Sequence, residues 1–183
     1  MEELSTIPTP CTTKIQALRD SIAQIIVGQT QATDLLLTSV IARGHVLIEG
    51  VPGVAKTLLA RVMAQLIDAR FSRVQFTPDL MPSDVLGTTV YNMKTGDFDF
   101  HPGPVFADVV LADEINRAPA KTQAALFEVM EERQVTVDGT PRAMSDVFTI
   151  IATQNPVEQE GTYKLPEAQL DRFLMKITMD YPT

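Results

Sequence analysis

One segment of the sequence combines glycines, a lysine and a threonine in an order that suits the binding of phosphate groups. The segment is Gly50–Thr57 (GVPGVAKT), and it lies between the apolar run Val46–Ile48 and a helical pattern that begins near Lys56. Small residues let successive backbone N–H groups point inward around phosphate oxygens, and the positive end of a following helix strengthens this attraction. Lys56 would reach the β- and γ-phosphates of a nucleotide, and the hydroxyl of Thr57 would bind Mg²⁺.

The loop departs from the general phosphate-loop pattern at one position, because Ala55 stands where a glycine usually precedes the lysine. Its methyl group crowds the loop but removes no N–H donor. The alternative interpretation is a simple turn, in which Gly50 and Gly53 only join a strand to a helix. If the loop binds phosphate, the residues around the nucleotide are Gly50, Val51, Pro52, Gly53, Val54, Ala55, Lys56, Thr57 and Leu58.

A pair of carboxylates follows another apolar run, Val109–Ala112. In an open α/β sheet, ligands bind at the edge where parallel strands end, so Asp113 and Glu114 would lie beside the phosphate loop. Asp113 would hold Mg²⁺ through its water shell, and Glu114 would polarise an attacking water molecule. A solvated acidic turn is the alternative, and the neighbouring phosphate loop favours the catalytic interpretation.

Two further side chains are candidates for the same chemistry. Asn155 follows the predicted strand 147–152 and could orient the water that Glu114 activates, although an Asn before a proline is also an ordinary turn signal. Arg172 precedes the last predicted strand. An arginine near a helix end is commonly a surface charge or a partner of the helix dipole, and the alternative is stabilisation of transition-state charge in a neighbouring subunit.

The elements that would position these residues alternate between short apolar strands and helices. This alternation is typical of an α/β domain built on a mostly parallel sheet, here with five strands flanked by helices. The first helix has apolar residues at helical spacing and closes at Gly28, which suits a helix C-terminus. The strands are expected at 46–48, 71–76, 109–112, 147–152 and 173–179, and the later helices at 30–42, 58–66, 119–132 and 166–170.

Two stretches interrupt the alternation and predict β-hairpin insertions at about 88–101 and about 133–144. The second contains Asp138-Gly139 between β-prone residues, which is the strongest short signal for a hairpin turn. Residues 1–13 contain two prolines and several threonines and predict a flexible tail, so the nucleotide-binding core is expected to span 14–183.

Composition excludes several classes of protein. The chain has 183 residues, and 45% of them are hydrophobic, so general disorder is excluded. The longest apolar runs have four residues, too few for a membrane span. The net charge of −8 makes a nucleic-acid partner unfavourable. With Cys11 as the single cysteine, an internal disulfide is excluded and a reducing cytoplasm is the expected location.

Taken together, these segments resemble the AAA+ ATPases, and more closely the MoxR family within them. The loop GVPGVAKT is similar to the MoxR form, in which alanine commonly replaces the generic glycine. Five further segments resemble family signatures and occur in the expected order, which makes the match specific. They are FTPDLMPSD (76–84), LADEINRAPAKTQAAL (111–126), MEERQVTVDG (130–139), IATQNPVEQEGTY (151–163) and LPEAQLDRF (165–173).

The resemblance implies a P-loop NTPase core of the AAA+ type and assigns roles to the matching positions. The two hairpins would be the helix-2 insert and the pre-sensor-1 hairpin. The implied roles are Walker A for Lys56 and Thr57, Walker B for Asp113 and Glu114, sensor 1 for Asn155, and an arginine finger for Arg172. The segment Ile26-Val27-Gly28-Gln29 resembles the adenine-contacting turn, with Val27 and Gly28 as the residues that would contact the nucleotide.

The function implied is hydrolysis of ATP to ADP and phosphate with Mg²⁺, in a ring of like subunits that is expected to be a hexamer. Such a ring would remodel or mature protein clients that the sequence does not identify. AAA+ proteins carry a helical lid after this core, and the sequence ends at Thr183 without a sensor-2 arginine, so the lid is expected to be absent and hydrolysis weak. The alternatives are a nucleotide-binding core with little hydrolysis and a motor directed at nucleic acid.

Overall fold

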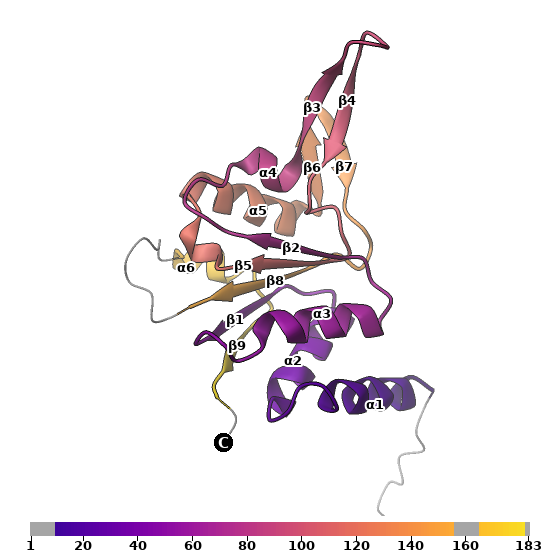
Figure 1. Cartoon of the computed structure of the whole chain (residues 1–183), viewed down its shortest axis with the longest axis vertical. Coiled ribbons are helices and arrows are strands. Elements are labelled where there is room, and N and C mark those ends of the chain that lie inside the picture. Colours follow the sequence, from indigo (N-terminus) through magenta and orange to yellow (C-terminus); the bar gives the residue numbers. More distant parts are fainter. Residues whose placement is uncertain (1–9, 156–164, 182–183) are drawn as a thin grey trace, which may run out of the picture.

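A computed structural model describes residues 10–155 and 165–181, and its centre is a sheet of five parallel strands in the order β2-β5-β8-β1-β9 (Figure 1). The parallel α/β fold predicted from the sequence is therefore confirmed. Because all five strands run in the same direction, their carboxyl ends emerge along one edge of the sheet. The strands are β1 (Val46–Gly50), β2 (Phe71–Gln75), β5 (Val109–Asp113), β8 (Thr149–Gln154) and β9 (Met175–Met179).

Helices cover both faces of the sheet (Figure 1). The helices α1, α2 and α3 lie on one face, and α4 and α5 lie on the other. The short helix η1 follows β5, and α6 precedes β9. Their bounds are α1 (Pro10–Ala23), α2 (Thr30–Ile41), α3 (Lys56–Leu66), α4 (Pro82–Leu86), η1 (Ile115–Arg117), α5 (Ala120–Glu132) and α6 (Glu167–Leu170).

The central strands are buried on both faces, which explains their continuous apolar sequence. All five residues of β5 are buried, and successive side chains alternate between the two hydrophobic clusters. Val110 contacts the cluster under α5, with Phe148 and Leu126, whereas Leu111 contacts the cluster under α3, with Met63. Full burial of each large side chain contributes about 1.5–3 kcal/mol, so these two layers hold the strand ends in place.

Several predicted boundaries shift by two residues, and the predicted N-terminal tail overlaps the first helix. Helix α1 begins at Pro10, so residues 10–13 form its first turn rather than the end of a tail. Proline is well suited to the first turn because its fixed φ is helical and its missing N–H would have had no partner there. The strand predicted at 147–152 is β8, which starts at Thr149.

The two predicted hairpins are present, and both project from the side of the sheet covered by α4 and α5 (Figure 1). Their strands pair only with each other within the described residues, so each hairpin is a separate two-stranded sheet. The Asp138-Gly139 turn has positive φ at both residues, 49° and 74°, as its sequence predicts. The strands are β3 (Gly87–Asn92) with β4 (Asp97–Pro102), and β6 (Gln134–Val137) with β7 (Thr140–Ala143).

A buried histidine connects β1, α5 and β8 at the amino-terminal edge of the sheet, opposite the edge where the strands end. His45 lies just before β1, where its Nδ1 accepts a hydrogen bond of 2.9 Å from the N–H of Ile150 and its Nε2 donates to the carbonyl of Met130 at 3.2 Å. This pattern requires the neutral imidazole. Burial lowers the pKa of His45 to about 4; the hydrogen bond to Met130 opposes this shift and the charge of Arg133 adds to it.

Candidate nucleotide-binding site

The phosphate loop connects the end of β1 to the start of α3, as the sequence predicts. Gly53 and Ala55 both have left-handed backbone conformations, with φ of 88° and 64°. A left-handed conformation costs a non-glycine residue roughly 1–2 kcal/mol, which explains why a glycine is usual before the lysine. Ala55 is therefore a strained residue at the N-cap of α3.

A side chain has no room at Gly50, the first residue of the loop. A Cβ atom placed there would lie 2.4 Å from the carbonyl oxygen of Met179, at the end of β9. The glycine thus allows β1 and β9 to approach each other where the loop begins. This close approach fixes the start of the loop against the sheet.

Lys56 turns back over the loop that precedes it. Its Nζ donates hydrogen bonds to the carbonyl oxygen of Gly50 and, at 3.4 Å, to that of Val51. The positive charge of the side chain is therefore placed over the loop, where the backbone N–H groups and the N-terminus of α3 also attract anions. A phosphate group bound by the loop would lie within reach of this ammonium.

Asp113 is the residue on which the contacts at the carboxyl edge converge. Its side chain is almost buried, with the residue 8% exposed. Oδ1 accepts a hydrogen bond of 2.6 Å from the hydroxyl of Thr153. Oδ2 accepts hydrogen bonds from Arg73, at 2.7 Å from Nη2 and 3.1 Å from Nε, and lies 3.5 Å from the hydroxyl of Thr57.

The contact between Thr57 and Asp113 suits a magnesium ion. The hydroxyl of Thr57 and the charged carboxylate of Asp113 both offer oxygen atoms as metal ligands. Mg²⁺ prefers a few such ligands together with phosphate oxygens and water. Thr57 lies in the first turn of α3, where the phosphate loop ends, and Asp113 is the last residue of β5. The residues present therefore fit the metal that the sequence predicts.

Glu114 is held in a defined orientation just beyond β5. Its backbone is left-handed, with φ of 57°, and its N–H donates a 2.9 Å hydrogen bond to the hydroxyl of Thr153. Its carboxylate Oε2 accepts hydrogen bonds of 2.9 Å from Gln75 and from Arg117. The hydroxyl of Thr153 thus connects the backbone of Glu114 to the carboxylate of Asp113.

The other two predicted catalytic residues have different positions. Asn155 is buried and directly follows β8, so it lies at the same edge of the sheet as Asp113. Arg172 lies outside this group: its Nη1 forms an ion pair of 2.5 Å with Glu131 of α5, and its side chain is 38% exposed. The structure does not bring Arg172 together with Asp113 and Glu114 within the chain.

A small apolar cavity adjoins the phosphate loop. It has a volume of about 110 Å³, and its walls come from the turn after α1, from the loop and from the first turn of α3. Val27 and Leu58, both predicted to contact the nucleotide, line this cavity, while Gly28 provides a positive φ of 76° in the adjoining turn. An apolar slot at this place suits the flat face of a nucleotide base.

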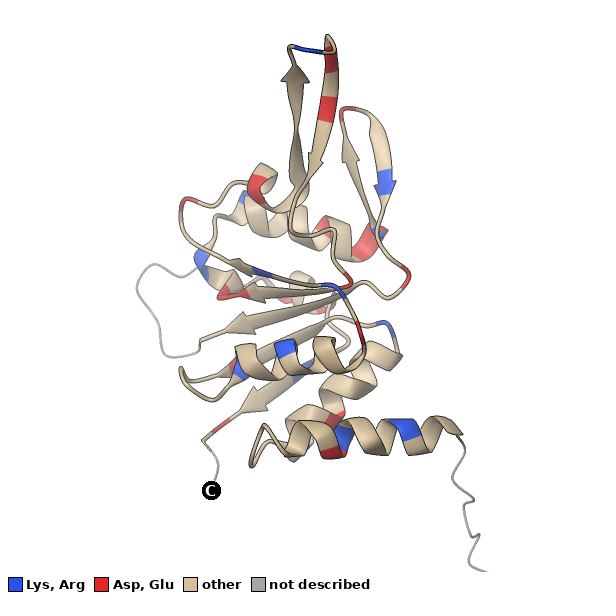
Figure 2. Cartoon of the chain, turned by 45° about the vertical axis from the view of Figure 1, so that its right-hand side comes forward, with Lys and Arg blue, Asp and Glu red and all other residues tan. Residues whose placement is uncertain are grey.

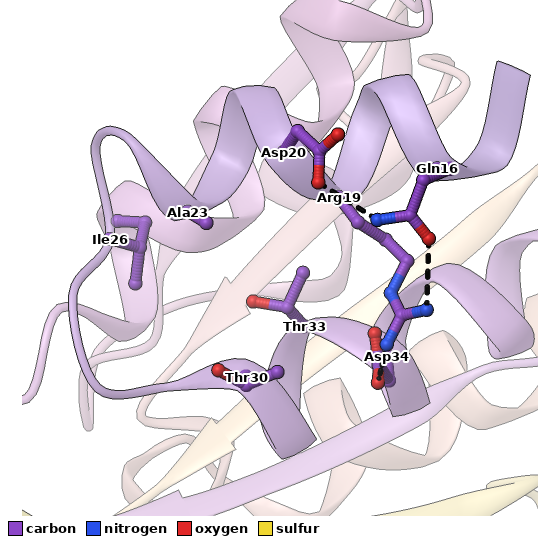
Figure 3. Close-up of a pocket in the computed structure, with 8 residues that line it drawn as sticks. All are labelled: Gln16, Arg19, Asp20, Ala23, Ile26, Thr30, Thr33 and Asp34. Carbon is purple, nitrogen blue, oxygen red and sulfur yellow. Dashed lines mark hydrogen bonds and ion pairs between the residues drawn. The ribbon is translucent and has the colours of Figure 1, made fainter.

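A second cavity, of about 160 Å³, lies between α1 and α2 (Figure 3). Arg19 crosses it and forms an ion pair of 2.5 Å with Asp34. None of the residues that line it comes from the phosphate loop or the carboxyl edge of the sheet. The slot beside the loop is therefore the better candidate for the base.

Four residues of this site were not found from the sequence: Arg73, Gln75, Thr153 and Arg117. Arg73 and Gln75 alternate with apolar residues on β2, a pattern that predicts only a solvent-facing side of an edge strand. Thr153 lies within the segment that the resemblance covers, but nothing in that segment indicates which carboxylate its hydroxyl contacts. These partners become visible only when the strands are placed side by side.

Comparison with known proteins agrees with this geometry. The sequence model of the ATPase family associated with various cellular activities (AAA) matches residues 45–175. Chaperone MoxR1 of Mycobacterium tuberculosis is 54% identical over 162 residues, which are 88% of this chain and 43% of MoxR1. The uncharacterised protein YeaC of Bacillus subtilis is 56% identical over 164 residues, which are 90% of this chain and 51% of YeaC.

A solved structure shares the fold as well as the sequence. The crystal structure of a candidate ATPase from Cytophaga hutchinsonii superposes with a TM-score of 0.84 at 51% identity, covering 93% of this chain and 52% of that one. The chain spans about half the length of the relatives it matches. No helix in the described ranges is long and apolar enough to cross a membrane. The chain belongs to the ATPase family associated with various cellular activities, and it is of the MoxR type.

Proposed function

We propose that the chain binds ATP together with Mg²⁺ and hydrolyses it to ADP and phosphate. The observation that carries the proposal is the arrangement at the carboxyl edge of the sheet. There the hydroxyl of Thr57, the last residue of the phosphate loop, lies 3.5 Å from the carboxylate of Asp113, and Glu114 is oriented by two hydrogen bonds. The proposal assigns a residue at this edge to each of the three functions that phosphoryl transfer needs: phosphate binding, metal binding and water activation.

Binding of the triphosphate would use the loop and Lys56. The ammonium now donates to the carbonyl oxygens of Gly50 and Val51, and a phosphate oxygen would replace them as its acceptor. The apolar slot that includes Val27 and Leu58 would receive the base. When bound, Mg²⁺ would neutralise charge on the β- and γ-phosphates, and Thr57 and Asp113 are the residues that would hold it.

Activation of the water is the role proposed for Glu114. Both hydrogen bonds that orient its carboxylate fall on Oε2, so we assign Oε1 to the attacking water. As the water oxygen bonds to the γ-phosphorus, the bond from that phosphorus to the bridging oxygen breaks, and Glu114 takes the proton from the water. Asn155, at the same edge, would help to orient this water.

The first test is turnover by Glu114→Gln, which keeps the size of the side chain but removes the base. We expect a loss of roughly 10²–10⁴-fold in ATP hydrolysis, with ATP affinity retained. Glu128→Gln, on the exposed side of α5, is the matched control and should keep the wild-type rate. Lys56→Ala sets the background. Unchanged turnover in Glu114→Gln would contradict the assignment.

We further propose a ring of like subunits in which Arg172 acts on the nucleotide of its neighbour. Support comes from its partly exposed side chain and from its ion pair with Glu131 of α5, which leaves it outside the group formed by Asp113 and Glu114 of its own chain. Arg172→Ala and Glu114→Gln should each be inactive alone. A mixture should regain activity, because some interfaces would combine an intact Glu114 with an intact Arg172. A mixture that stays inactive would remove Arg172 from the mechanism.

The ring would use hydrolysis to remodel or mature client proteins, as the name of the chaperone MoxR1 suggests for that relative. A nucleic-acid motor is less favoured, because the net charge is −8 and β4 of the first hairpin carries Asp97 and Asp99, in the acidic region near the hairpin tip (Figure 2). We place this activity in the cytoplasm, where the free Cys11 would stay reduced.

A second candidate is a nucleotide-binding core with little hydrolysis of its own. The ion pair between Arg172 and Glu131 favours it, because the arginine is engaged within its own chain. Calorimetric ATP binding without turnover at any protein concentration would support this alternative. Turnover per chain that rises with concentration would favour active sites formed between subunits.

A further inference from the structure

Arg73 covers the oxygen of Asp113 that faces the proposed metal site. It lies on β2, the edge strand of the sheet beside β5. Its Nε and Nη2 both donate to Oδ2 of Asp113, at 3.1 Å and 2.7 Å, and this is also the oxygen beside the hydroxyl of Thr57. Since Oδ1 is engaged by Thr153, both oxygens of the carboxylate already have donors.

A guanidinium and a hydrated Mg²⁺ would compete for this oxygen. Both are cations that seek the same lone pairs, and two positive charges within a few ångströms repel each other most strongly at a partly buried site. The side chain of Arg73 is 44% exposed, so its end group has solvent into which it can turn. Asp113 itself is almost buried, and its Oδ1 is held by the hydroxyl of Thr153.

Arg73 is also connected to the carboxylate that we assign to water activation. Its Nη2 donates a 2.8 Å hydrogen bond to Oε1 of Gln75, and Nε2 of the same amide donates to Oε2 of Glu114 at 2.9 Å. A continuous series of hydrogen bonds therefore runs from Asp113 through Arg73 and Gln75 to Glu114. Movement of the guanidinium would remove one of the contacts that orient the Gln75 amide.

We propose that Arg73 is a positioning residue that neutralises Asp113 before metal arrives, so that Mg²⁺ binding is an exchange of the guanidinium for the hydrated ion. This inference rests on the proposed ATPase function and adds a determinant of its metal affinity. Arg73 keeps the two neighbouring carboxylates of the empty site from repelling each other. It also sets the Mg²⁺ concentration at which the site fills.

The test measures metal affinity without relying on turnover. Mn²⁺, used as a paramagnetic substitute for Mg²⁺, is titrated into the ADP-bound chain and followed by electron paramagnetic resonance. Arg73→Met should lower the Kd for Mn²⁺ by roughly tenfold, because a competing cation is lost. Arg73→Lys keeps the charge but cannot donate two hydrogen bonds in the same plane, so its Kd for Mn²⁺ should lie between those of the wild-type and Arg73→Met proteins.

Arg70→Met is the matched control. Arg70 makes an ion pair with Asp108 at 3.0 Å, joining the same two strand segments at the opposite edge of the sheet. Its removal should leave the Kd for Mn²⁺ unchanged. An Arg73→Met protein with unchanged or weaker Mn²⁺ binding would overturn the proposal. Failure of the wild-type chain to bind ADP at all would instead contradict the proposed function.

A measurement on the wild-type chain keeps the proposal testable if the variants do not fold. The ¹⁵N-labelled Nε–H of Arg73 should exchange slowly with solvent in the metal-free, ADP-bound state, because it donates to Asp113. On addition of Mg²⁺ this exchange should accelerate, while that of Arg70 should not change. Continued protection of the Arg73 Nε–H in the presence of saturating Mg²⁺ would show that no exchange of cations takes place.

Discussion

The amino and carboxyl edges of the parallel sheet carry the same kinds of side chains in different surroundings. At the amino edge, Arg70 and Asp108 form an ion pair with two side-chain hydrogen bonds, and Asp108 also accepts a 2.9 Å hydrogen bond from the backbone N–H of Arg70. At the carboxyl edge, Arg73 and Asp113 form a similar ion pair near the phosphate loop. Chemistry alone therefore does not distinguish a pair that joins two strands from a pair proposed to lie beside a bound ligand; position along the strands does.

The surroundings of the two aspartates explain the difference. The hydrogen bond from Arg70 lowers the pKa of Asp108 to about 2, and no residue of the phosphate loop is among its partners. Asp113 contacts a hydroxyl from the helix after the loop and a hydroxyl from β8, and it immediately precedes Glu114. Asp113 therefore has partners beside the phosphate loop, whereas Asp108 contacts Arg70 before β2 and accepts a hydrogen bond from the N–H of Thr149 at the start of β8.

The largest expected difference between the edges is in metal-dependent turnover. Asp113→Asn removes the charge that would hold the metal through water, and we expect a loss of roughly 100-fold or more in the affinity for Mg²⁺ and in ATP hydrolysis. Asp108→Asn should lower the thermal stability but leave hydrolysis within a factor of two or so of wild type. Equal losses of hydrolysis in both variants would show that the contrast between the edges is false.

The next effect concerns stability and pH at the amino edge. The folded chain keeps His45 neutral down to about pH 4, whereas the unfolded chain takes up the proton near pH 6.5. Neutral His45 should therefore contribute fully to the free energy of unfolding above pH 6.5. As the pH drops from 6.5 to 4, this free energy should fall by about 3 kcal/mol.

Urea unfolding across this range measures the loss. His45→Asn should flatten the dependence, and His101→Asn, which removes an exposed imidazole on β4, is the matched control. If His45→Asn keeps the wild-type slope between pH 6.5 and 4, another group is responsible for it.

The smallest effect tests strain at the carboxyl edge. Ala55→Gly replaces a left-handed alanine, and the free energy of unfolding should rise by about 1 kcal/mol. Ala17→Gly, at an exposed position of α1, should lower it by roughly 0.5–1 kcal/mol. Chemical denaturation of the two variants gives opposite signs if the strain is real. Two losses of similar size would show that Ala55 is not strained.

The sequence predicts the fold well because its signals are local. Apolar runs such as Val109–Ala112 can only be buried strands in this context, and Asp138-Gly139 determines its hairpin turn without help from distant residues. The prolines and threonines of residues 1–13 predict a tail, whereas Pro10 begins α1, because proline is favourable in a first turn. Local signals also gave the phosphate loop and the two carboxylates after β5.

The partners of those residues depend on which strands lie side by side. Arg73 contacts Asp113 only because β2 pairs with β5, and these residues are 40 positions apart in the sequence. The ion pair between Arg172 and Glu131 is likewise a contact between distant segments. A pattern of alternating polar residues shows that a side chain is outside the core, but not which carboxylate it neutralises.

The order of the strands also has a consequence for synthesis of the protein. The phosphate loop follows β1, whose neighbours among the described strands are β8 and β9, which begin at Thr149 and Met175. About 125 residues must therefore be translated after Gly50 before both neighbours of β1 exist, which takes roughly 6–25 s at ordinary ribosome speeds. During that interval the nascent chain carries a complete phosphate-binding motif without the strands that hold it in shape.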